Sequence, residues 1–210
     1  MLNAEFLTFH EFVTHEPLPL SKIQGAVLEF LQGREDAVLF GAQAVNAYVS
    51  EPRATADVDI MSTRAHEFAE ELRQHLCDTF HIAVRVREIK DKGLRLYQVR
   101  KEGNRHLVDV RIEDAFRPNQ LVEQLYVLTP SELIASKVTS YCSRKGQPKA
   151  FTDRRDIAVL LLRFPELKVE SGEVYEALTK QNATPDALRF WIELVDEVIV
   201  MPETDDDLTY

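Results

Sequence analysis

The stretch Arg53-Ala-Thr-Ala-Asp-Val-Asp-Ile60 decides the fold, because it places two carboxylates one residue apart in an otherwise apolar strand. Side chains of a strand alternate between its two faces, so Asp57 and Asp59 project together while Val58 and Ile60 point to the other side. Two neighbouring anions repel each other and are costly to bury without a countercharge. A divalent cation is the usual solution, and hard oxygen ligands of this kind favour magnesium or manganese over zinc.

A glycine turn precedes this acidic strand. Residues 37–40 are typical of a short buried strand, Gly41 and Ala42 interrupt it, and residues 43–49 have helical spacing. The N-terminus of a helix offers free N–H groups to a phosphate, and glycine lets a ligand approach the backbone closely. The sequence therefore predicts a phosphate-binding turn next to the metal ligands.

A third carboxylate is needed if two metal ions are to bridge the attacking and leaving oxygens of a transfer reaction. Asp109 is the best candidate, because it lies in the apolar run Leu107-Val-Asp-Val-Arg-Ile112, which is typical of a strand. We expect this strand to pair beside the strand of Asp57. The alternative is an aspartate exposed to water near Arg105 and Arg111.

Together these motifs resemble the DNA polymerase β-like nucleotidyltransferase superfamily, over roughly the first half of the chain. Within that superfamily the chain is most similar to the AbiEii-type toxins and related small bacterial enzymes. The residues that carry this similarity are Gly41, Ala42, Arg53, Thr55, Asp57, Asp59, Lys137, Asp153 and Asp156.

The resemblance implies an enzyme that uses a nucleoside triphosphate and Mg²⁺ or Mn²⁺. Its catalytic and metal-binding residues would be Asp57, Asp59 and Asp109, the last of which would help to activate the acceptor hydroxyl. Its nucleotide-binding residues would be Gly41, Ala42, Arg53, Thr55 and Lys137.

Four charged residues in the second half form a possible additional site. Lys137 and Arg144 are seven positions apart in a predicted helix, and therefore lie on one face. Asp153 and Asp156 lie three apart at the start of another predicted helix, where they would bind a ligand or only cap the helix. For Lys137 and Arg144 the alternative is a solvated helix face.

The predicted fold class is α/β (α+β), with a small mixed β-sheet flanked by helices and followed by a helical domain. We expect a nucleotidyltransferase domain at 1–125, a helical domain at 126–200 and a flexible acidic tail at 201–210. Hydrophobic spacing and turn signals predict strands at 37–40, 82–86, 94–99 and 106–112, and helices at 21–31, 43–49, 64–77, 130–144, 153–163, 172–180 and 185–198.

Composition is that of an ordinary globular protein, with 45% hydrophobic and 29% charged residues among 210. No apolar run reaches the length of a membrane helix, and the acids in the first eleven residues do not fit a signal peptide. Two distant cysteines, Cys77 and Cys142, are expected to be free thiols. We therefore expect a cytoplasmic protein with no membrane partner.

The acceptor is less well defined by the sequence. Net charge is −10, yet residues 81–105 hold eight basic and three acidic residues, which leaves +5 on one stretch that could dock a polyanion or only protect strand edges from aggregation. The AbiEii-type resemblance implies RNA, such as a tRNA 3′ end, and a partner antitoxin. The alternatives are transfer to a small molecule of the aminoglycoside type, and a non-catalytic relative that binds a nucleotide or a protein.

Overall fold

The structure, a computed structural model, describes residues 18–89 and 93–200. The chain divides into two units, with the boundary in the sequence between Thr129 and Pro130, and each unit is described by itself. Three parts of the sequence analysis lie outside the described residues. They are the first eleven residues, Lys90 and Lys92 of the basic stretch, and the predicted acidic tail at 201–210.

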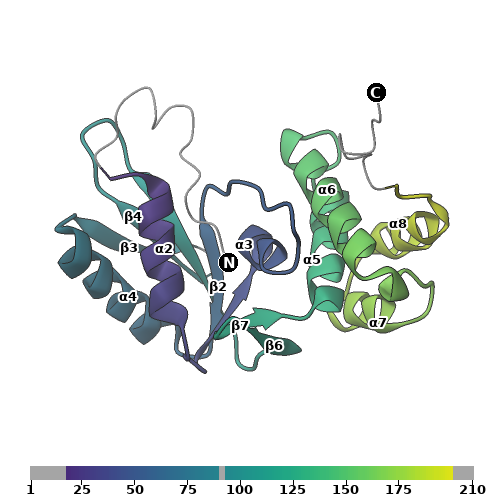
Figure 1. Ribbon diagram of the computed structural model, residues 1–210, viewed down its shortest axis with the longest axis horizontal. Helices are drawn as coiled ribbons and strands as arrows, with labels where there is room; N and C mark the ends of the chain where they lie inside the picture. Colours follow the sequence, from purple (N-terminus) through teal and green to yellow (C-terminus); the bar gives the residue numbers. More distant parts are fainter. Residues whose placement is uncertain (1–17, 90–92, 201–210) are drawn as a thin grey trace, which may run out of the picture. The chain divides into compact units, whose positions relative to one another are not determined.

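A mixed sheet of seven strands forms the first unit, in the order β3-β4-β5-β2-β1-β7-β6 (Figure 1). β1 pairs antiparallel with β2 and parallel with β7, while β2 pairs parallel with β5. The strands are β1 Ala37–Phe40, β2 Val58–Ser62, β3 Val84–Ile89, β4 Gly93–Gln98, β5 Arg105–Ile112, β6 Asn119–Val122 and β7 Leu125–Leu128.

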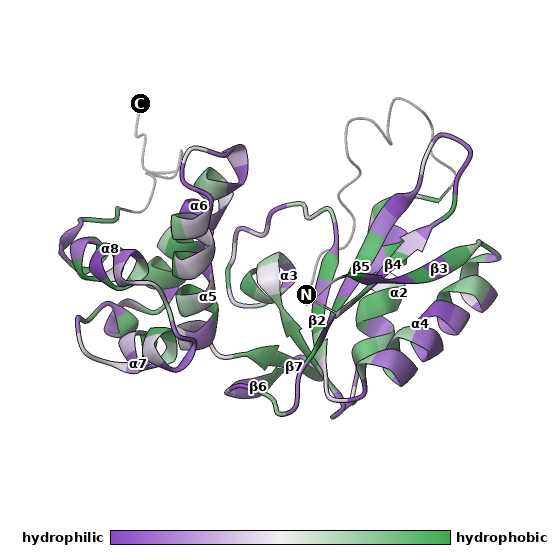
Figure 2. Cartoon of the chain, turned by 180° about the vertical axis from the view of Figure 1, so that it is seen from behind, coloured by the Kyte–Doolittle hydropathy of each residue, from purple (hydrophilic) through white to green (hydrophobic). Residues whose placement is uncertain are grey.

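One face of this sheet is apolar and is covered by helices. Cross-strand partners in β4, β5 and β2 line up as Leu94, Val110 and Ile60 in one row, all of them buried. The helices α2 Leu20–Leu31 and α4 Ala65–Phe80 lie together along the sheet (Figure 1), and in Figure 2 the side of α4 that faces away from the strands is hydrophilic. The alternate residues, among them Asp59 and Asp109, therefore point to the opposite face.

Several elements of this unit differ from the predictions. Strand β3, predicted at 82–86, runs Val84–Ile89, and helix α4, predicted at 64–77, runs Ala65–Phe80. Helix α3, predicted at 43–49, runs Gly41–Asn46 and thus begins directly at the glycine. The β6–β7 hairpin was not predicted, because its turn is made by Glu123 and Gln124, which adopt φ values of 46° and 69° without a glycine or asparagine. The predicted fold class itself is confirmed.

The second unit consists of helices, α5 Pro130–Ser143, α6 Pro148–Arg163, α7 Glu173–Lys180 and α8 Pro185–Asp196, with a short 3-10 helix η1 Pro165–Leu167. Trp191 is fully buried in its core. Helix α8 follows Thr184, whose hydroxyl accepts a hydrogen bond from the Ala187 N–H and caps the helix. No described helix of either unit is long and apolar enough to cross a membrane.

Helix α6 begins five residues earlier than predicted, and this corrects the interpretation of Asp153 and Asp156. The two acids stand inside the helix rather than in its first turn, so they do not cap it. Their side chains are only 4% and 1% exposed, and both contact the Lys137 ammonium of α5, at 3.4 Å from Asp153 Oδ1 and 2.7 Å from Asp156 Oδ2. Arg144 Nη1 lies 3.3 Å from Asp153 Oδ2.

Lys137, Asp153 and Asp156 form a buried ion-pair network that joins α5 to α6, and the partly exposed Arg144 and Arg155 contact its carboxylates from the edge. Lys137 is buried and does not lie on a solvated helix face, which was the alternative left open by the sequence. Removing one partner of a buried ion pair is strongly destabilising, because the remaining charge loses a countercharge that it cannot replace with water. The network therefore has a structural role, whether or not it also binds a ligand.

We predict that Lys137→Met lowers the free energy of unfolding by about 3 kcal/mol, because it leaves two buried carboxylates without their ammonium. Urea denaturation followed by circular dichroism measures the change. Lys180→Met is the matched control, since Lys180 is 71% exposed in its pair with Glu176 and should contribute under about 0.5 kcal/mol. Equal stability of wild type and Lys137→Met would contradict the structural role of the network.

Candidate active site

The predicted acidic residues meet on the face of the sheet that α2 and α4 leave open. β2 and β5 are parallel neighbours, and their register places Asp59 directly beside Asp109. Asp57 stands two residues before Asp59, immediately ahead of β2, whose first residue is Val58. Two strands of the sheet thus bring three carboxylates to one region of one face.

The glycine turn lies against the second of these carboxylates. Gly41 has φ +72°, and a Cβ added to it would come within 2.0 Å of Asp59 Oδ2. This approach arises because Phe40, the residue before Gly41, is the antiparallel partner of Asp59. Only glycine satisfies both the left-handed backbone and the contact.

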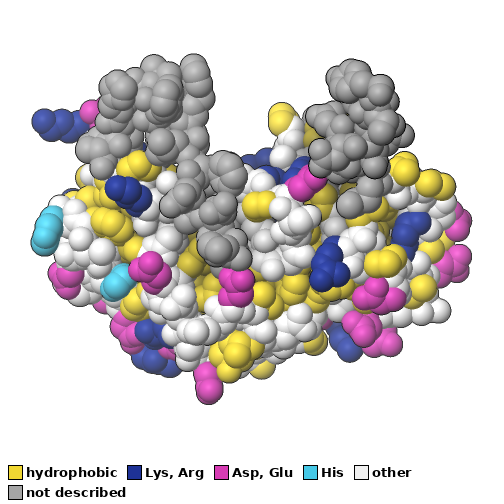
Figure 3. Space-filling view, in the orientation of Figure 1, with side chains coloured by type: hydrophobic (Ala, Val, Ile, Leu, Met, Phe, Trp, Pro, Cys, Tyr) yellow, Lys and Arg dark blue, Asp and Glu magenta, His cyan; other side chains and the backbone are white. Residues whose placement is uncertain are grey.

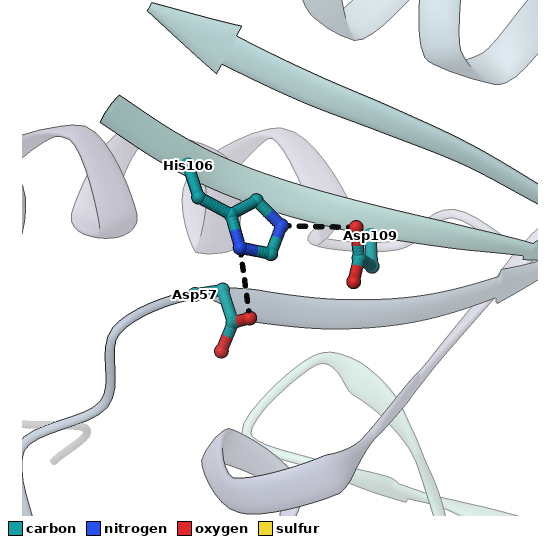
Figure 4. A group of neighbouring side chains, drawn as sticks. All are labelled: Asp57, His106 and Asp109. Carbon is teal, nitrogen blue, oxygen red and sulfur yellow. Dashed lines mark hydrogen bonds and ion pairs between the residues drawn. The ribbon is translucent and has the colours of Figure 1, made fainter. Parts of the chain in front are cut away.

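A histidine that the sequence analysis did not identify, His106, lies between the other two carboxylates, Asp57 and Asp109 (Figure 4). His106 Nδ1 is 3.1 Å from Asp57 Oδ2, and His106 Nε2 is 2.9 Å from Asp109 Oδ1. All three side chains are about a quarter exposed, at 26–27%. The cluster is therefore held within the fold and is still open to solvent.

A β-bulge explains why His106 and Asp109, three residues apart, face the same side. Leu96 of β4 pairs with Val108, whereas the next residue, Tyr97, pairs with His106, so Leu107 is an extra residue on β5. Such an insertion reverses the alternation of side chains at that point. Leu107 is buried instead, at 1% exposure.

Arg95 fixes the third carboxylate. Its Nε and Nη2 atoms donate to Asp109 Oδ1 and Oδ2 at 2.7 and 2.8 Å, which is the bidentate geometry of a strong ion pair. Burial alone would raise the pKa of Asp109, but the hydrogen bonds from Arg95 and His106 outweigh it and hold that pKa well below its ordinary range. The same ion pair raises the pKa of Arg95. Asp109 is therefore ionised over the whole physiological range.

The segment that leads into β2 is held by amide side chains of two helices. Gln43 Nε2 donates to the Thr55 hydroxyl at 2.8 Å, and Gln24 Nε2 donates to the Thr55 carbonyl at 3.0 Å. Asn46 makes two bonds with the backbone of Arg53, accepting from its N–H and donating to its carbonyl. The sequence analysis named Arg53 and Thr55 but missed these three amides. Gln24 could have been found, because a polar side chain within the apolar stripe of a helix indicates a buried hydrogen bond.

The candidate metal ligands differ in part from those expected. Among the described residues, the group whose ligand atoms all lie within 4.8 Å of one another is Asp57, His106 and Asp109. Asp59 lies outside this group and lies next to Gly41. Ala42 is the second residue of α3, and the candidates of the second unit, Lys137, Arg144, Asp153 and Asp156, belong to the network described above.

We predict that Gly41→Ala destabilises the protein by about 3 kcal/mol, since it adds a steric overlap with Asp59 to the strain of a positive φ. Gly33→Ala is a matched control: Gly33 has φ +70°, but an added Cβ meets nothing within 4 Å, so only the strain of about 1 kcal/mol remains. Urea denaturation of both variants measures the difference. Similar losses in the two variants would exclude the contact with Asp59 as the cause.

We predict that Arg95→Gln lowers stability by about 1 kcal/mol at neutral pH, a value discounted because Arg95 is 42% exposed. The pKa of Asp109 is lower in the folded protein than its ordinary 3.8, so its contribution is complete above about pH 4 and is lost as the pH falls further. Unfolding free energies between pH 7 and pH 2 should therefore depend less on pH in the variant. Arg87→Gln, which changes the exposed cross-strand neighbour of Arg95, should leave the dependence as in wild type.

Comparison with known proteins supports the fold and nothing finer. No family model matches the sequence, and no curated protein matches it. The solved structure of JHP933 from Helicobacter pylori is 15% identical, with a TM-score of 0.57 over 93% of this chain and 84% of that one. A putative nucleotidyltransferase from the same organism is 13% identical, with a TM-score of 0.53 over 90% of this chain and 93% of that one.

The polyadenylate synthase of Megavirus is a further structural neighbour. It is 12% identical, with a TM-score of 0.55, and the match covers 74% of this chain and 34% of that one. Identities this low carry no information about substrate or activity. The structural similarity, with TM-scores above 0.5, shows that the chain has the nucleotidyltransferase fold.

Proposed function

We propose that this protein is a metal-dependent nucleotidyltransferase, which moves a nucleoside monophosphate from a nucleoside triphosphate to an acceptor hydroxyl. The single observation that carries the proposal is the pairing of β2 with β5, which sets Asp59 beside Asp109 with Asp57 two residues away. The fold shared with solved nucleotidyltransferases is consistent with it.

The donor set fits a divalent cation. Carboxylate oxygens of Asp57 and Asp109 lie close together on one face of the sheet, and Asp59 stands beside them. Such ligands suit Mg²⁺ or Mn²⁺, which would neutralise the charge on the phosphate oxygens during transfer. Within the chain, Arg95 forms an ion pair with Asp109, and His106 contacts both Asp57 and Asp109.

The triphosphate would bind at the glycine turn. Gly41 has no side chain to block the approach of a phosphate, and the first N–H groups of α3, from Gly41 and Ala42, have no partners within their own helix. Arg53 and Thr55, held by the amides of α2 and α3, border this turn. The resemblance also implies a nucleotide-binding role for Lys137, whose ammonium is paired with Asp153 and Asp156 in the second unit.

The reaction is a substitution at the α-phosphorus. The acceptor hydroxyl oxygen forms a bond to this atom, the bond to the bridging oxygen of the β-phosphate breaks, and pyrophosphate leaves with the electron pair. Asp109 would help to activate the hydroxyl by accepting a hydrogen bond from it, and the proton passes to water, because Arg95 holds the pKa of Asp109 too low for this carboxylate to keep a proton. Catalysis of this type is mostly positioning and charge stabilisation, so the loss of one carboxylate is severe.

For the acceptor we propose RNA, because basic side chains lie on the same face as the acids. The register joins Arg87 to Arg95 and Arg95 to Asp109, while Arg85 pairs with Tyr97, the partner of His106. Arg85 and Arg87 are exposed. On the face drawn in Figure 3, by contrast, acidic and basic side chains are interspersed and no large region has one sign.

This basic surface is narrower than the sequence alone predicted. Arg95 is paired with Asp109, and Arg105 donates to the Leu18 carbonyl at 2.9 Å. Arg85 and Arg87, which are exposed and placed on this face by their register, are therefore the described residues on which the proposal depends. We further propose, from the AbiEii-type resemblance, that the RNA is a tRNA 3′ end, that the activity is toxic, and that a partner antitoxin controls it.

The transfer activity is tested by incubating the protein with Mg²⁺ or Mn²⁺, each α-labelled nucleoside triphosphate, and either total RNA or a mixture of aminoglycosides. We expect label on RNA, and a loss of at least about 100-fold in the Asp57→Asn/Asp59→Asn double variant. Asp78→Asn, an exposed change on α4, is the matched control and should keep full activity. Label on the aminoglycosides alone would reject RNA as the acceptor. No transfer, with equal nucleotide binding by wild type and double variant, would favour a non-catalytic binding protein.

A salt titration of RNA binding in the same samples tests the surface itself. Arg85→Ala/Arg87→Ala should weaken binding and reduce the slope of log affinity against log salt by about 1 to 2. Each phosphate contact that forms releases counterions, so binding with fewer contacts depends less on salt. Arg73→Ala, on α4, is the control, because this residue pairs with Glu70 on a helix that covers the other face of the sheet. An unchanged slope in the double variant would assign RNA binding to another surface.

A further inference from the structure

The position of His106 suggests a role that a set of aspartates alone does not provide. Its two ring nitrogens contact Asp57 and Asp109, and the three ligand atoms lie within 4.8 Å of one another. Ligands of one ion lie at most about 4.4 Å apart, because metal–ligand distances are about 2.0–2.2 Å. Only small side-chain movements separate this arrangement from a three-ligand site.

The backbone is adapted to bring the imidazole there. Without the bulge at Leu107, alternation along β5 would turn His106 to the covered face of the sheet, away from Asp109. Bulges leave a residue unpaired and are found where a side chain has to be redirected next to a site. Here the redirected side chain is the imidazole.

Arg95 orients the Asp109 carboxylate without occupying all of its lone pairs. Each carboxylate oxygen has two lone pairs. Arg95 takes one on Oδ2 of Asp109, which leaves the other free on that atom, and holds the carboxylate in a fixed orientation. Partners of this kind orient the ligands of metal sites.

We propose that His106 is a metal ligand together with Asp57 and Asp109, and that it makes the site selective for a first-row transition-metal ion such as Mn²⁺ or Co²⁺ over Mg²⁺. Mg²⁺ prefers oxygen ligands and retains its waters, whereas imidazole nitrogen binds the transition ions well. The inference rests on the proposed function only in sharing its site. It specifies which ion that site takes.

The test measures metal binding without nucleotide. Protein freed of metal with a chelator is titrated calorimetrically with Mn²⁺, Co²⁺ and Mg²⁺, and the visible absorption of bound Co²⁺ is recorded because it changes with a nitrogen ligand. The variants are His106→Gln and, as the matched control, His66→Gln, which alters an exposed histidine of α4 in the same unit.

We expect wild type and His66→Gln to bind Mn²⁺ and Co²⁺ at least about tenfold more tightly than Mg²⁺. His106→Gln should lose this preference and the Co²⁺ spectrum, with little change for Mg²⁺. The same Co²⁺ affinity and spectrum in His106→Gln and wild type would overturn the proposal. If that variant does not fold, the ¹⁵N resonances of the wild-type imidazole decide: a large shift of one ring nitrogen on adding Zn²⁺ supports ligation, and no shift rejects it.

The two proposals can fail separately. Label transfer with Mg²⁺ in a protein whose metal binding ignores His106 would reject the metal selectivity and leave the transferase intact. Metal binding through His106 in a protein that transfers no nucleotide would do the reverse.

Discussion

The first unit depends on one constraint, the parallel pairing of β2 with β5. In that register Asp59 and Asp109 stand side by side, and like charges in this position destabilise a sheet. The guanidinium of Arg95 on β4 gives Asp109 a countercharge, and the imidazole of His106 on β5 contacts the same carboxylate. The bulge in β5 and the glycine at the start of α3 both serve this group of acids.

The second unit solves a similar problem in a different way. Asp153 and Asp156 are nearly inaccessible to solvent, and Lys137 reaches both from the neighbouring helix. In both units a basic side chain lies within 4 Å of the clustered acids, Arg95 beside Asp109 and Lys137 beside Asp153 and Asp156. The net charge of −10 is a sum over the whole chain and therefore says little about either cluster.

Sequence reasoning was most successful where side chains follow a regular period. Alternation in strands was enough to associate Asp57 with Asp59 and to propose Asp109 as their neighbour. It could not find His106, because the bulge at Leu107 breaks the period on which the reasoning depends. Arg95 was counted as part of a basic stretch, since its partner lies fourteen residues away on another strand.

Other differences have equally physical causes. The start of α6 at Pro148 could have been predicted from the proline, which suits the first turn of a helix. The predicted start was instead placed at Asp153, because acids are also common in the first turn. The burial of Lys137 depends on which face of α5 meets α6, and a single helix pattern does not determine that. The β6–β7 hairpin uses Glu123 and Gln124 in a turn that normally needs glycine or asparagine.

The contact between Gly41 and Asp59 also constrains how this protein can evolve. A side chain at position 41 is incompatible with the carboxylate at position 59, so the two positions cannot drift independently. A lineage that gave up the acid for glycine would lose the barrier to substitution at the turn, and selection would then no longer preserve Gly41 for this reason.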